Sequence, residues 1–290
     1  MMRIVLAVLL AISTCACTNE NQSIPPAPHA IVVGVLPDQS KANLATRYGP
    51  LVDYLEAATG LHIELEIPSS YEQMLDDFDT GRLDVAAFGG LTYVQAEQRS
   101  RAQPLVMRDV DLQFLSCYLV RAADARGSLA DFKGTTFAFG PRLSTSGHLM
   151  PRYFLNAGDM PPEEFFASIR HSSGHDQTVE WVRDGDVVIG VANCDIAQSM
   201  LDNRDVSANS IRILDTTPAY ANYVWATQQS LDASIKTLLR DAFLALNKTN
   251  PEHRALLMAQ GANGFLPAGK NDFEDVRAAV REIGLVNMAN

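Results

Sequence analysis

Three consecutive hydroxyl residues followed by a glycine, Ser144-Thr145-Ser146-Gly147, form the stretch of this sequence best suited to chemistry. An apolar pattern with helical spacing follows directly. Serine and threonine are favoured helix N-caps, because their side-chain oxygens accept the unpaired amide hydrogens of the first turn. That turn also presents free N–H groups and the positive end of the helix dipole, which suit an anion. By itself the motif predicts a capped helix, and its context decides whether it is also an anion site.

The context is a set of polar residues that follow the expected strands. In open α/β sheets, ligands bind beyond the carboxyl ends of the strands. The residues at these positions are rich in hydroxyls, include an imidazole and contain no lysine or arginine: Asp38-Gln39-Ser40, Ser69-Ser70-Tyr71, Phe88-Gly89-Gly90, Ser144-Thr145-Ser146, His175 and Asn193-Cys194-Asp195. Such a lining favours an oxyanion held by hydrogen bonds rather than by salt bridges.

Alternating strand and helix patterns must position these groups. We expect strands over 31–36, 61–67, 83–88, 112–120, 134–139, 166–170, 187–192, 211–214 and 223–226. Helices are expected directly after Ser146 and over 44–59, 71–78, 91–100, 177–184, 234–246, 251–258 and 272–282. This alternation is typical of α/β proteins in which a mostly parallel sheet is flanked by helices.

The length of the chain indicates two lobes. Roughly 273 residues follow the N-terminal segment, which exceeds the usual size of a single core. The run at 112–120 is expected to cross into a second lobe over 119–213. The chain would then return, so that 31–118 and 214–290 together form the first lobe.

The N-terminus has the pattern of a bacterial lipoprotein signal peptide over residues 1–17. A basic residue is followed by a short apolar run and by small residues that end at Cys17. Ala16 precedes Cys17, which makes it the expected lipid site, with Cys15 as the second choice; a soluble secreted protein cut nearby is the alternative. The polar, proline-bearing stretch 18–30 is typical of a flexible tether.

Charge and composition exclude several functions. With 23 basic and 34 acidic residues the net charge is −11, which argues against nucleic acid and against a basic membrane-binding surface. Cys117 and Cys194 form either a disulfide or two buried thiols, and the sequence does not decide between them. His171 and His175 have the i, i+4 spacing of metal ligands, but no further ligand completes a set, so we expect no metal. No cofactor is indicated.

Several motifs, taken in order, resemble the phosphate, phosphite and phosphonate solute-binding family of ABC transporters. They are Gly34-Val35-Leu36-Pro37, Leu44 with Tyr48-Gly49-Pro50-Leu51, Asp84-Val85-Ala86-Ala87-Phe88-Gly89, Ser144-Thr145-Ser146-Gly147 with Pro151, and Gly174-His175-Asp176. The resemblance covers about 31–258. It implies a two-lobed periplasmic-binding-protein fold of the second topological type, in which two crossing strands join the lobes and a hinge motion closes them on the ligand.

The resemblance also implies roles for individual residues. Ser144, Thr145 and Ser146, with Gly147, would hold the phosphonate oxygens through hydroxyls and backbone amides. His175 would donate to the same group, and Tyr71 would contact it from the other lobe. Asp195 matches an acidic position that faces the cleft. Simpler roles remain open for three of them: helix-start packing for Tyr71, a surface loop for His175 and a helix cap for Asp195.

Two departures from the family pattern bear on the ligand. Phe88 stands where members often carry a tyrosine, so one hydroxyl donor is lost. Asn222 stands where some members place an aspartate that can serve an amino group of the ligand. The sequence therefore favours a small ligand without an amine, such as phosphite or methylphosphonate, over an aminoalkyl phosphonate.

These observations predict an extracytoplasmic, lipid-anchored solute-binding protein that captures a small phosphorus oxyanion and delivers it to an ABC permease. The protein would bind its ligand and would not be an enzyme. A binding protein that signals to a membrane histidine kinase would have the same cleft and is the first alternative. A secreted hydrolase is the second, although the chain has no G-x-S-x-G motif.

Overall fold

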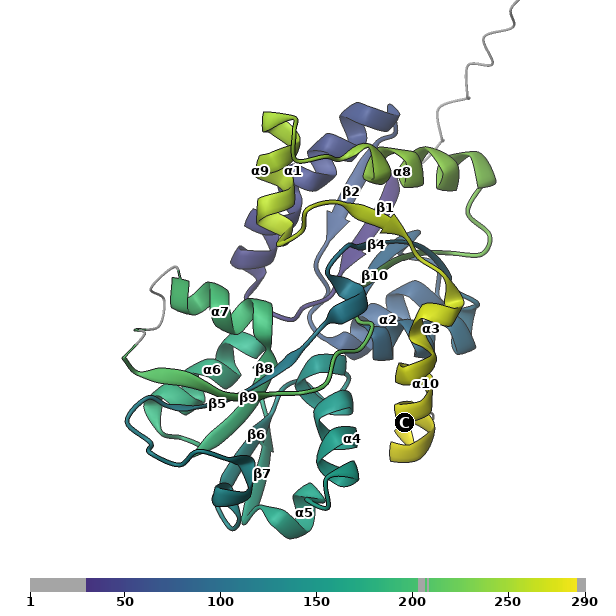
Figure 1. Cartoon of the computed structure of the whole chain (residues 1–290). Coiled ribbons are helices and arrows are strands. Elements are labelled where there is room, and N and C mark those ends of the chain that lie inside the picture. Colours follow the sequence, from purple (N-terminus) through teal and green to yellow (C-terminus); the bar gives the residue numbers. More distant parts are fainter. Residues whose placement is uncertain (1–29, 203–206, 208, 286–290) are drawn as a thin grey trace, which may run out of the picture.

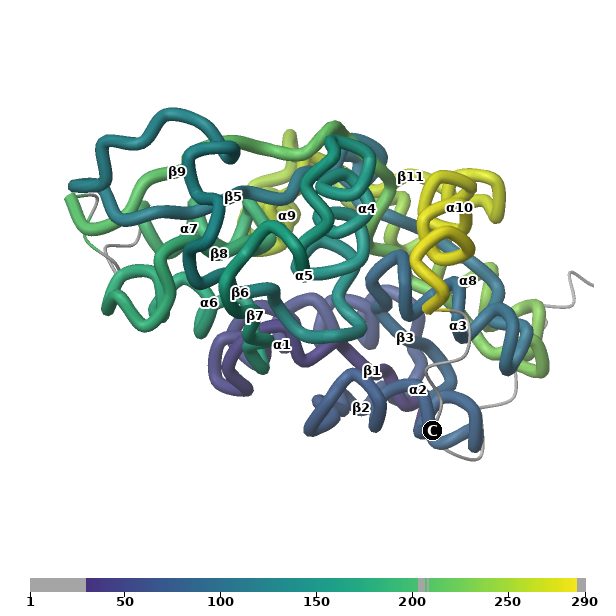
Figure 2. The backbone as a smooth tube through the Cα atoms, turned by 90° about the horizontal axis from the view of Figure 1, so that it is seen from below, coloured from purple at the N-terminus to yellow at the C-terminus, as the bar shows by residue number. Residues whose placement is uncertain are grey.

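A computed structural model describes residues 30–202, 207 and 209–285 of the chain. Two sheets, each flanked by helices, form two lobes, drawn one above the other in Figure 1. Figure 2, seen from the side of the second lobe, shows its chain lying in front of α1 (Lys41–Thr59) and α9 (Pro251–Gln260) of the first lobe. The two-lobed α/β architecture expected from the sequence is confirmed. The expectation of mostly parallel sheets is wrong, because both sheets are mixed: in each, the strand by which the chain enters from the other lobe runs antiparallel to its neighbours.

The first lobe contains a six-stranded mixed sheet in the order β11-β4-β10-β3-β1-β2. Parallel pairing joins β1 to β2 and β3, whereas β10 runs antiparallel to β3 and β4. Its strands are β1 (Ile31–Val35), β2 (Ile63–Glu66), β3 (Val85–Phe88), β4 (Gln103–Arg108), β10 (Val224–Thr227) and β11 (Phe265–Pro267).

Helices cover both faces of this sheet. On one face α1, α9 and α8 (Ala233–Ala245) pack on the apolar side chains of the strands. On the other face lie α2 (Tyr71–Asp79), α3 (Gly90–Ser100) and α10 (Glu274–Ile283), together with η4 (Lys270–Phe273). Because both faces are covered, β3 is buried along its whole length, which explains its continuous apolar sequence.

The second lobe contains a five-stranded sheet in the order β7-β6-β8-β5-β9. Its strands are β5 (Ser116–Arg121), β6 (Thr136–Phe139), β7 (Ser168–His171), β8 (Ile189–Asn193) and β9 (Ile211–Thr216). Its helical elements are η2 (Leu129–Phe132), η3 (Thr145–Leu149), α4 (Met150–Ala157), α5 (Pro162–Phe165), α6 (His175–Asp184) and α7 (Cys194–Asp202). A disulfide joins Cys117 of β5 to Cys194 at the start of α7, which decides the question that the sequence left open.

Two segments, 109–115 and 217–223, connect the lobes and lie side by side. The amide of Phe114 donates to the carbonyl of Tyr220 (2.9 Å), and the amide of Tyr220 donates back to Phe114 (3.1 Å). The first of these segments contains the short helix η1 (Asp111–Gln113). The pair forms a two-stranded connection of the kind around which lobes can hinge.

The expected lobe boundaries, after 118 and after 213, fall inside strands and need correction. β5 pairs with β8 from Ser116 onward, and β9 pairs with β5 as far as Thr216, so both strands belong wholly to the second lobe. The expected return to the first lobe at residue 214 is therefore wrong, because the chain leaves the second lobe only after Thr216. An apolar run reveals a strand but not the sheet that it joins, because sheet membership depends on pairing partners far away in the sequence.

An apolar cluster continues from the first lobe into the second. Leu149 and Met150, from the start of α4, belong to the same buried cluster as Phe273, Val276 and other residues of η4 and α10. Figure 1 shows α10 lying beside α4, so the C-terminal helix packs along the boundary between the lobes. No helix within the described residues is both long and apolar enough to span a bilayer. Cys15 and Cys17 lie outside the described residues.

Candidate functional site

The hydroxyl motif forms a buried turn at the start of η3 in the second lobe. Ser144 is the N-cap, and its Oγ accepts a hydrogen bond from the Gly147 amide (2.9 Å). The first amides of a helix have no partner within it, so those of Thr145 and Ser146 point out of the helix start. The side chains of all three hydroxyl residues are buried. A Cβ atom on Gly147 would lie 2.8 Å from the His175 ring, so this position requires glycine.

His175 lies beside this turn at the start of α6 and is fully buried. Its Nδ1 accepts a hydrogen bond from the Asn193 amide (3.1 Å), which leaves the ring proton on Nε2. That Nε2–H group lies 3.2 Å from Ser144 Oγ, to which it donates. Because Ser144 Oγ accepts from both His175 and Gly147, its own hydrogen is left to be donated elsewhere.

Burial keeps the His175 ring neutral. Removal from water disfavours the charged form and lowers its pKa to about 4, which the nearby carboxylate of Asp176 offsets only in part. At neutral pH this wall of the site therefore consists of uncharged donors. Such a wall can hold an oxyanion through oriented hydrogen bonds without a formal positive charge.

Thr145 connects the two lobes. Its Oγ1 accepts a hydrogen bond from the Leu91 amide in the first turn of α3 (2.9 Å), and the neighbouring Gly90 amide donates to Asn222 Oδ1 (3.1 Å). Gly89, the N-cap of α3, has no side chain with which to cap these amides. Thr145 and Asn222 supply the missing caps, so both are positioned by first-lobe backbone.

Tyr71 lies on the first-lobe side of the site, at the start of α2, where Ser70 caps the helix. Its hydroxyl is buried and has no hydrogen-bond partner of normal geometry among the described residues. Burial, and then the charge of Asp38, raises its pKa well above the ordinary value, while the nearby Ser144 hydroxyl lowers it in part. The hydroxyl therefore keeps its proton and is a free donor.

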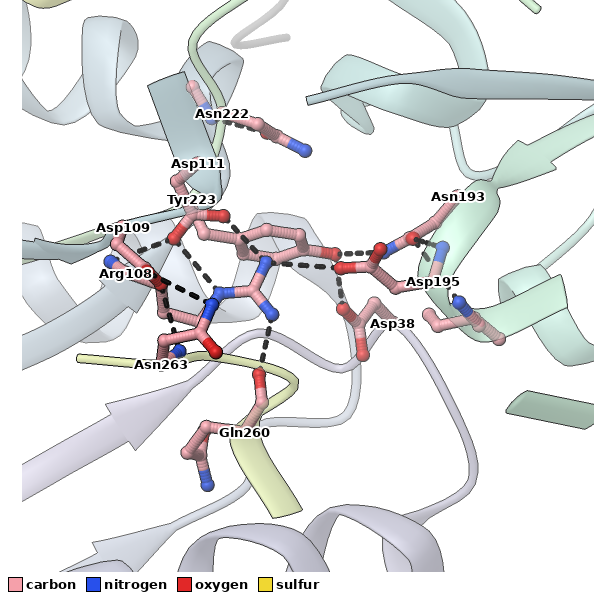
Figure 3. Close-up of polar contacts among 12 residues, drawn as sticks. Asp38, Arg108, Asp109, Asp111, Asn193, Asp195, Asn222, Tyr223, Gln260 and Asn263 are labelled. Atoms are coloured by element: carbon pink, nitrogen blue, oxygen red, sulfur yellow. Dashed lines mark hydrogen bonds and ion pairs between the residues drawn. The ribbon is translucent and has the colours of Figure 1, made fainter. Parts of the chain in front are cut away.

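Asp38 lies beyond the end of β1, where its charge acts on the Tyr71 hydroxyl. Figure 3 shows its side chain beside the hydroxyl end of Tyr223. Its side chain is buried, and Oδ2 accepts a hydrogen bond from the Tyr223 hydroxyl (2.5 Å). Asn193 Nδ2 donates to the same hydroxyl (3.0 Å). Among the described residues, Oδ1 has no partner. The Asp38 carbonyl accepts from the His175 amide across the lobes (2.9 Å).

Burial also raises the pKa of Asp38, against the opposing effects of Arg47, of the Tyr223 hydroxyl and of Arg108. Arg108 lies over the Tyr223 ring, 5.3 Å from its centroid. The donors of this guanidinium are directed to other groups, to both carboxylate oxygens of Asp111 and to the Gln260 carbonyl. Arg108 therefore holds Tyr223 in place without forming an ion pair with Asp38.

Asp195 lies in the first turn of α7, and its described contacts are with Arg108 and Asn193. Its side chain is 47% exposed and one carboxylate oxygen lies 3.4 Å from Arg108. It borders an interlobe groove of about 480 Å³ that also contains Arg47 and Met258. Its position facing the cleft agrees with the sequence expectation, but its described ionic partner is Arg108, so a direct contact with ligand stays a prediction.

Two further sequence-selected residues have mainly structural surroundings. Phe88 is fully buried and packs edge-to-face against Phe78, with ring centroids 5.1 Å apart. His171 stacks on Phe139 and its Nδ1 lies 3.1 Å from the Gly140 carbonyl, whereas His175 Nδ1 accepts from the Asn193 amide. Within the described part of the chain, no group of three or more His, Cys, Asp or Glu side chains is arranged to hold a metal ion.

The structure thus brings Ser144, Thr145, Ser146, Gly147 and His175 together, with Tyr71 opposite. Asp38 was among the residues that follow strands, but no motif or local pattern assigned it a role. The signal that identifies it is its burial with one unpaired oxygen, which only the folded arrangement reveals.

Comparison with known proteins agrees with this geometry. A family profile described as "ABC transporter, phosphonate, periplasmic substrate-binding protein" matches residues 33–273. The chain is 27% identical over 271 residues to the probable ABC transporter phosphite binding protein PhnD1 of Prochlorococcus marinus (strain MIT 9301), with 89% of this chain and 91% of the relative covered. It is also 27% identical over 251 residues to the phosphate-import protein PhnD of Mycolicibacterium smegmatis, with 81% and 78% covered.

A solved structure of the Prochlorococcus protein in complex with methylphosphonate is also similar. It superposes with a TM-score of 0.84 at 26% identity, and the match covers 89% of this chain and 99% of that chain. The family resemblance read from the motifs is confirmed. Since the profile spans most of both lobes, the chain belongs to the family of phosphonate-type periplasmic substrate-binding proteins of ABC transporters.

Proposed function

We propose that this protein captures a small phosphorus oxyanion without an amino group, such as phosphite, methylphosphonate or phosphate, and delivers it unchanged to an ABC permease. The observation that carries the proposal is the set of buried, neutral hydroxyl and amide donors of the Ser144 turn, opposite the Tyr71 hydroxyl. His175 holds this turn in place rather than donating to the ligand itself, because both of its ring nitrogens have partners within the protein. The ligand would lie between the two lobes and contact both of them.

The size and chemistry of this donor set support a small tetrahedral ligand. Hydroxyls and first-turn amides from one short turn can surround only a compact group, and they donate hydrogen bonds without adding charge. The relatives support the same class, since their names mention phosphite and phosphate and one is solved with methylphosphonate. The proposed role is binding and release, because the His175 ring beside Ser144 donates its Nε2–H group and so cannot accept the Ser144 proton as an activating base would.

Titration calorimetry with phosphite, phosphate, methylphosphonate, ethylphosphonate and sulfate tests the proposal. We expect the tightest binding from phosphite or methylphosphonate, and a ligand-dependent rise in melting temperature in parallel, because a ligand that binds only the native state stabilises it. Absence of binding by all the phosphorus ligands would refute the proposal.

Aminoethylphosphonate sharpens the choice of ligand. Asn222, whose Oδ1 already accepts from the Gly90 amide, offers no negative charge to an ammonium group. Burial of an unpaired cation is costly, so aminoethylphosphonate should bind more weakly than methylphosphonate. The reverse order in calorimetry would mean that an acid of the cleft, Asp38 or Asp195, binds the amine.

We also propose that Cys17 carries a lipid that holds the protein at the membrane outside the cytoplasm. The support is the small-residue sequence before Cys17 and the polar tether after it. Cys17→Ser should move the protein from the membrane fraction to the soluble fraction. Release by Cys15→Ser, with Cys17→Ser still membrane-bound, would assign the lipid to Cys15 instead.

A further inference from the structure

The carboxylate of Asp38 is unusual for a site that binds anions. Its Oδ2 accepts from Tyr223, whereas its Oδ1 is buried with no partner among the described residues. A buried oxygen in this state gains stability only when a hydrogen-bond donor reaches it. Among the described residues no donor reaches this oxygen, and the nearby Tyr71 hydroxyl is not hydrogen-bonded to it, so the donor that completes it can come with a ligand.

A fully deprotonated oxyanion cannot supply that donor. Its oxygens are acceptors only, and an oxygen facing the Asp38 carboxylate would be repelled at close range in a water-poor site. A single proton between the two oxygens removes this conflict. It makes no difference to the contact whether the proton is counted with the carboxyl group or with the phosphorus acid.

We propose that Asp38 selects ligands by their protonation: Oδ1 shares one proton with one ligand oxygen, so the site prefers oxyanions with an acidic P–OH group over anions of equal shape and charge that have none. This inference rests on the proposed function and adds the chemical basis of its selectivity.

The tyrosines and the histidine around Asp38 do not account for a change of affinity with pH, so we assign that change to the shared proton. The titratable and charged groups that face it are Arg47 and Tyr48 from α1, Tyr71 from α2, Arg108 from β4 with Asp111, His175 and Asp176 from α6, and Tyr223 before β10. Burial raises the pKa of the three tyrosines, and that of His175 falls to about 4, so none of these four changes its protonation between pH 6 and 9.

Two other acids lie near this cluster, and Asp176 is the control whereas Asp195 is the competing acid of the cleft. Asp176 accepts hydrogen bonds from the amides of Ser40 (3.0 Å) and Gln177 (2.9 Å). Asp195 pairs with Arg108 in the neighbouring groove. Both acids lie near the site and have described partners, whereas Asp38 Oδ1 has none.

Methylphosphonate and methanesulfonate form a matched ligand pair. The methylphosphonate monoanion and methanesulfonate have the same shape and charge, but only the phosphonate has an acidic proton, with a second pKa in the region of ~6 by analogy with phosphate esters. Wild-type protein at pH 6 should bind methylphosphonate about 10- to 100-fold more tightly than methanesulfonate, the range expected for one charge-assisted hydrogen bond. Its affinity for methylphosphonate should fall about tenfold per pH unit once the ligand is fully ionised.

Asp38→Asn is the decisive variant. The amide oxygen can still accept from Tyr223, while the amide nitrogen can donate to a ligand oxygen that has no proton. We expect the preference for methylphosphonate over methanesulfonate to fall to less than about threefold, and the decline above pH 7 to flatten. Asp176→Asn should keep both wild-type properties. Melting curves of the unliganded variants check that they fold.

Calorimetry of the wild type in two buffers of different ionisation enthalpy gives a test that needs no variant. At pH 8 the binding of methylphosphonate should take up close to one proton. Three results would each overturn the role of Asp38. They are the absence of proton uptake, equal affinity of the wild type for both ligands at pH 6, and an affinity for methylphosphonate that stops depending on pH only in Asp195→Asn. Failure of the wild type to bind any phosphorus oxyanion would instead overturn the proposed function, and this inference with it.

Discussion

The two walls of the site differ in how completely their hydrogen bonds are formed within the protein. On the second-lobe wall, the Asn193 amide, the His175 ring, the Ser144 hydroxyl and the Gly147 amide form one connected set. On the first-lobe wall, the Tyr71 hydroxyl and Asp38 Oδ1 are buried without partners among the described residues. The second lobe is therefore organised in advance, whereas the first lobe offers groups that a ligand can complete.

This difference suggests how binding and closure are coupled. A ligand held by the second-lobe donors would provide partners for the first-lobe groups only when the lobes are together. Two hydrogen bonds across the lobes, from His175 N to Asp38 O and from Leu91 N to Thr145 Oγ1, already fix the relative position of the walls. The free energy gained by the unpaired groups would then favour the closed state specifically in the presence of ligand.

The largest effect should come from the organised wall. Thr145→Ala or Ser146→Ala removes a donor hydroxyl, which should cost about 1.5–3 kcal/mol, or roughly 10- to 150-fold in affinity for methylphosphonate. Calorimetry measures the affinity, and circular dichroism should show an unchanged fold. Thr145→Ser keeps the hydroxyl and should bind nearly as well as the wild type. Near-wild-type affinity in both alanine variants would leave the turn with a helix-capping role only.

The neutral state of His175 has a consequence for stability. Its pKa in the folded protein is about 4, below the unfolded value of about 6.5, so the unfolded chain binds the proton first as the pH falls. Its contribution is fully present above pH 6.5 and is lost between about pH 6.5 and pH 4. Between pH 7 and pH 5, the free energy of unfolding should therefore fall by about 2 kcal/mol because of His175. Denaturant melts of His175→Gln should lack this part of the pH dependence.

His148 is the matched control for this measurement. Burial lowers its pKa to about 3, but its ring contacts the Arg142 carbonyl and Arg152 and not Ser144. His148→Gln should remove a similar part of the pH dependence while affecting affinity much less than His175→Gln. An identical pH dependence in the wild type and His175→Gln would contradict the neutral, preorganised state of the ring.

The contrast between the walls also explains what could be predicted from the sequence. The hydroxyl turn and His175 are adjacent to strands and a helix start, so local pattern and motif were enough to identify them. The alternation that predicted β1, β3 and α1 also depends on nearby residues. β4 was missed because Pro104 lacks an amide donor and argues against a strand. The short β11 was missed because three residues are too few to show the alternation of apolar and polar side chains that indicates a strand.

Asp38, in contrast, could not be identified from local pattern. Its role depends on Tyr223, which is 185 residues away and donates to one oxygen, and on the absence of any described donor for the other. Asp195, which the resemblance favoured, has the right residue type at a cleft-facing position, but Arg108 lies beside it. Packing between residues that are far apart in the sequence decides which of the two acids contacts a ligand. Local patterns in a single sequence do not reveal such packing.

The smallest effect should come from the unpaired hydroxyl of Tyr71. Tyr71→Phe removes a buried polar atom that lacks a partner, so the unliganded protein should become more stable, by up to about 1 kcal/mol. The same change removes a donor to the ligand and should weaken binding by roughly tenfold. Tyr93 gives the matched control, since its hydroxyl is likewise buried without a partner of normal geometry among the described residues, near Glu97 and Arg277, and its ring packs on Phe273. Tyr93→Phe should raise the melting temperature similarly and leave the affinity unchanged. If Tyr71→Phe instead destabilised the unliganded protein without affecting affinity, its hydroxyl would be satisfied within the first lobe, and the contrast between a completed wall and an incomplete one would be lost.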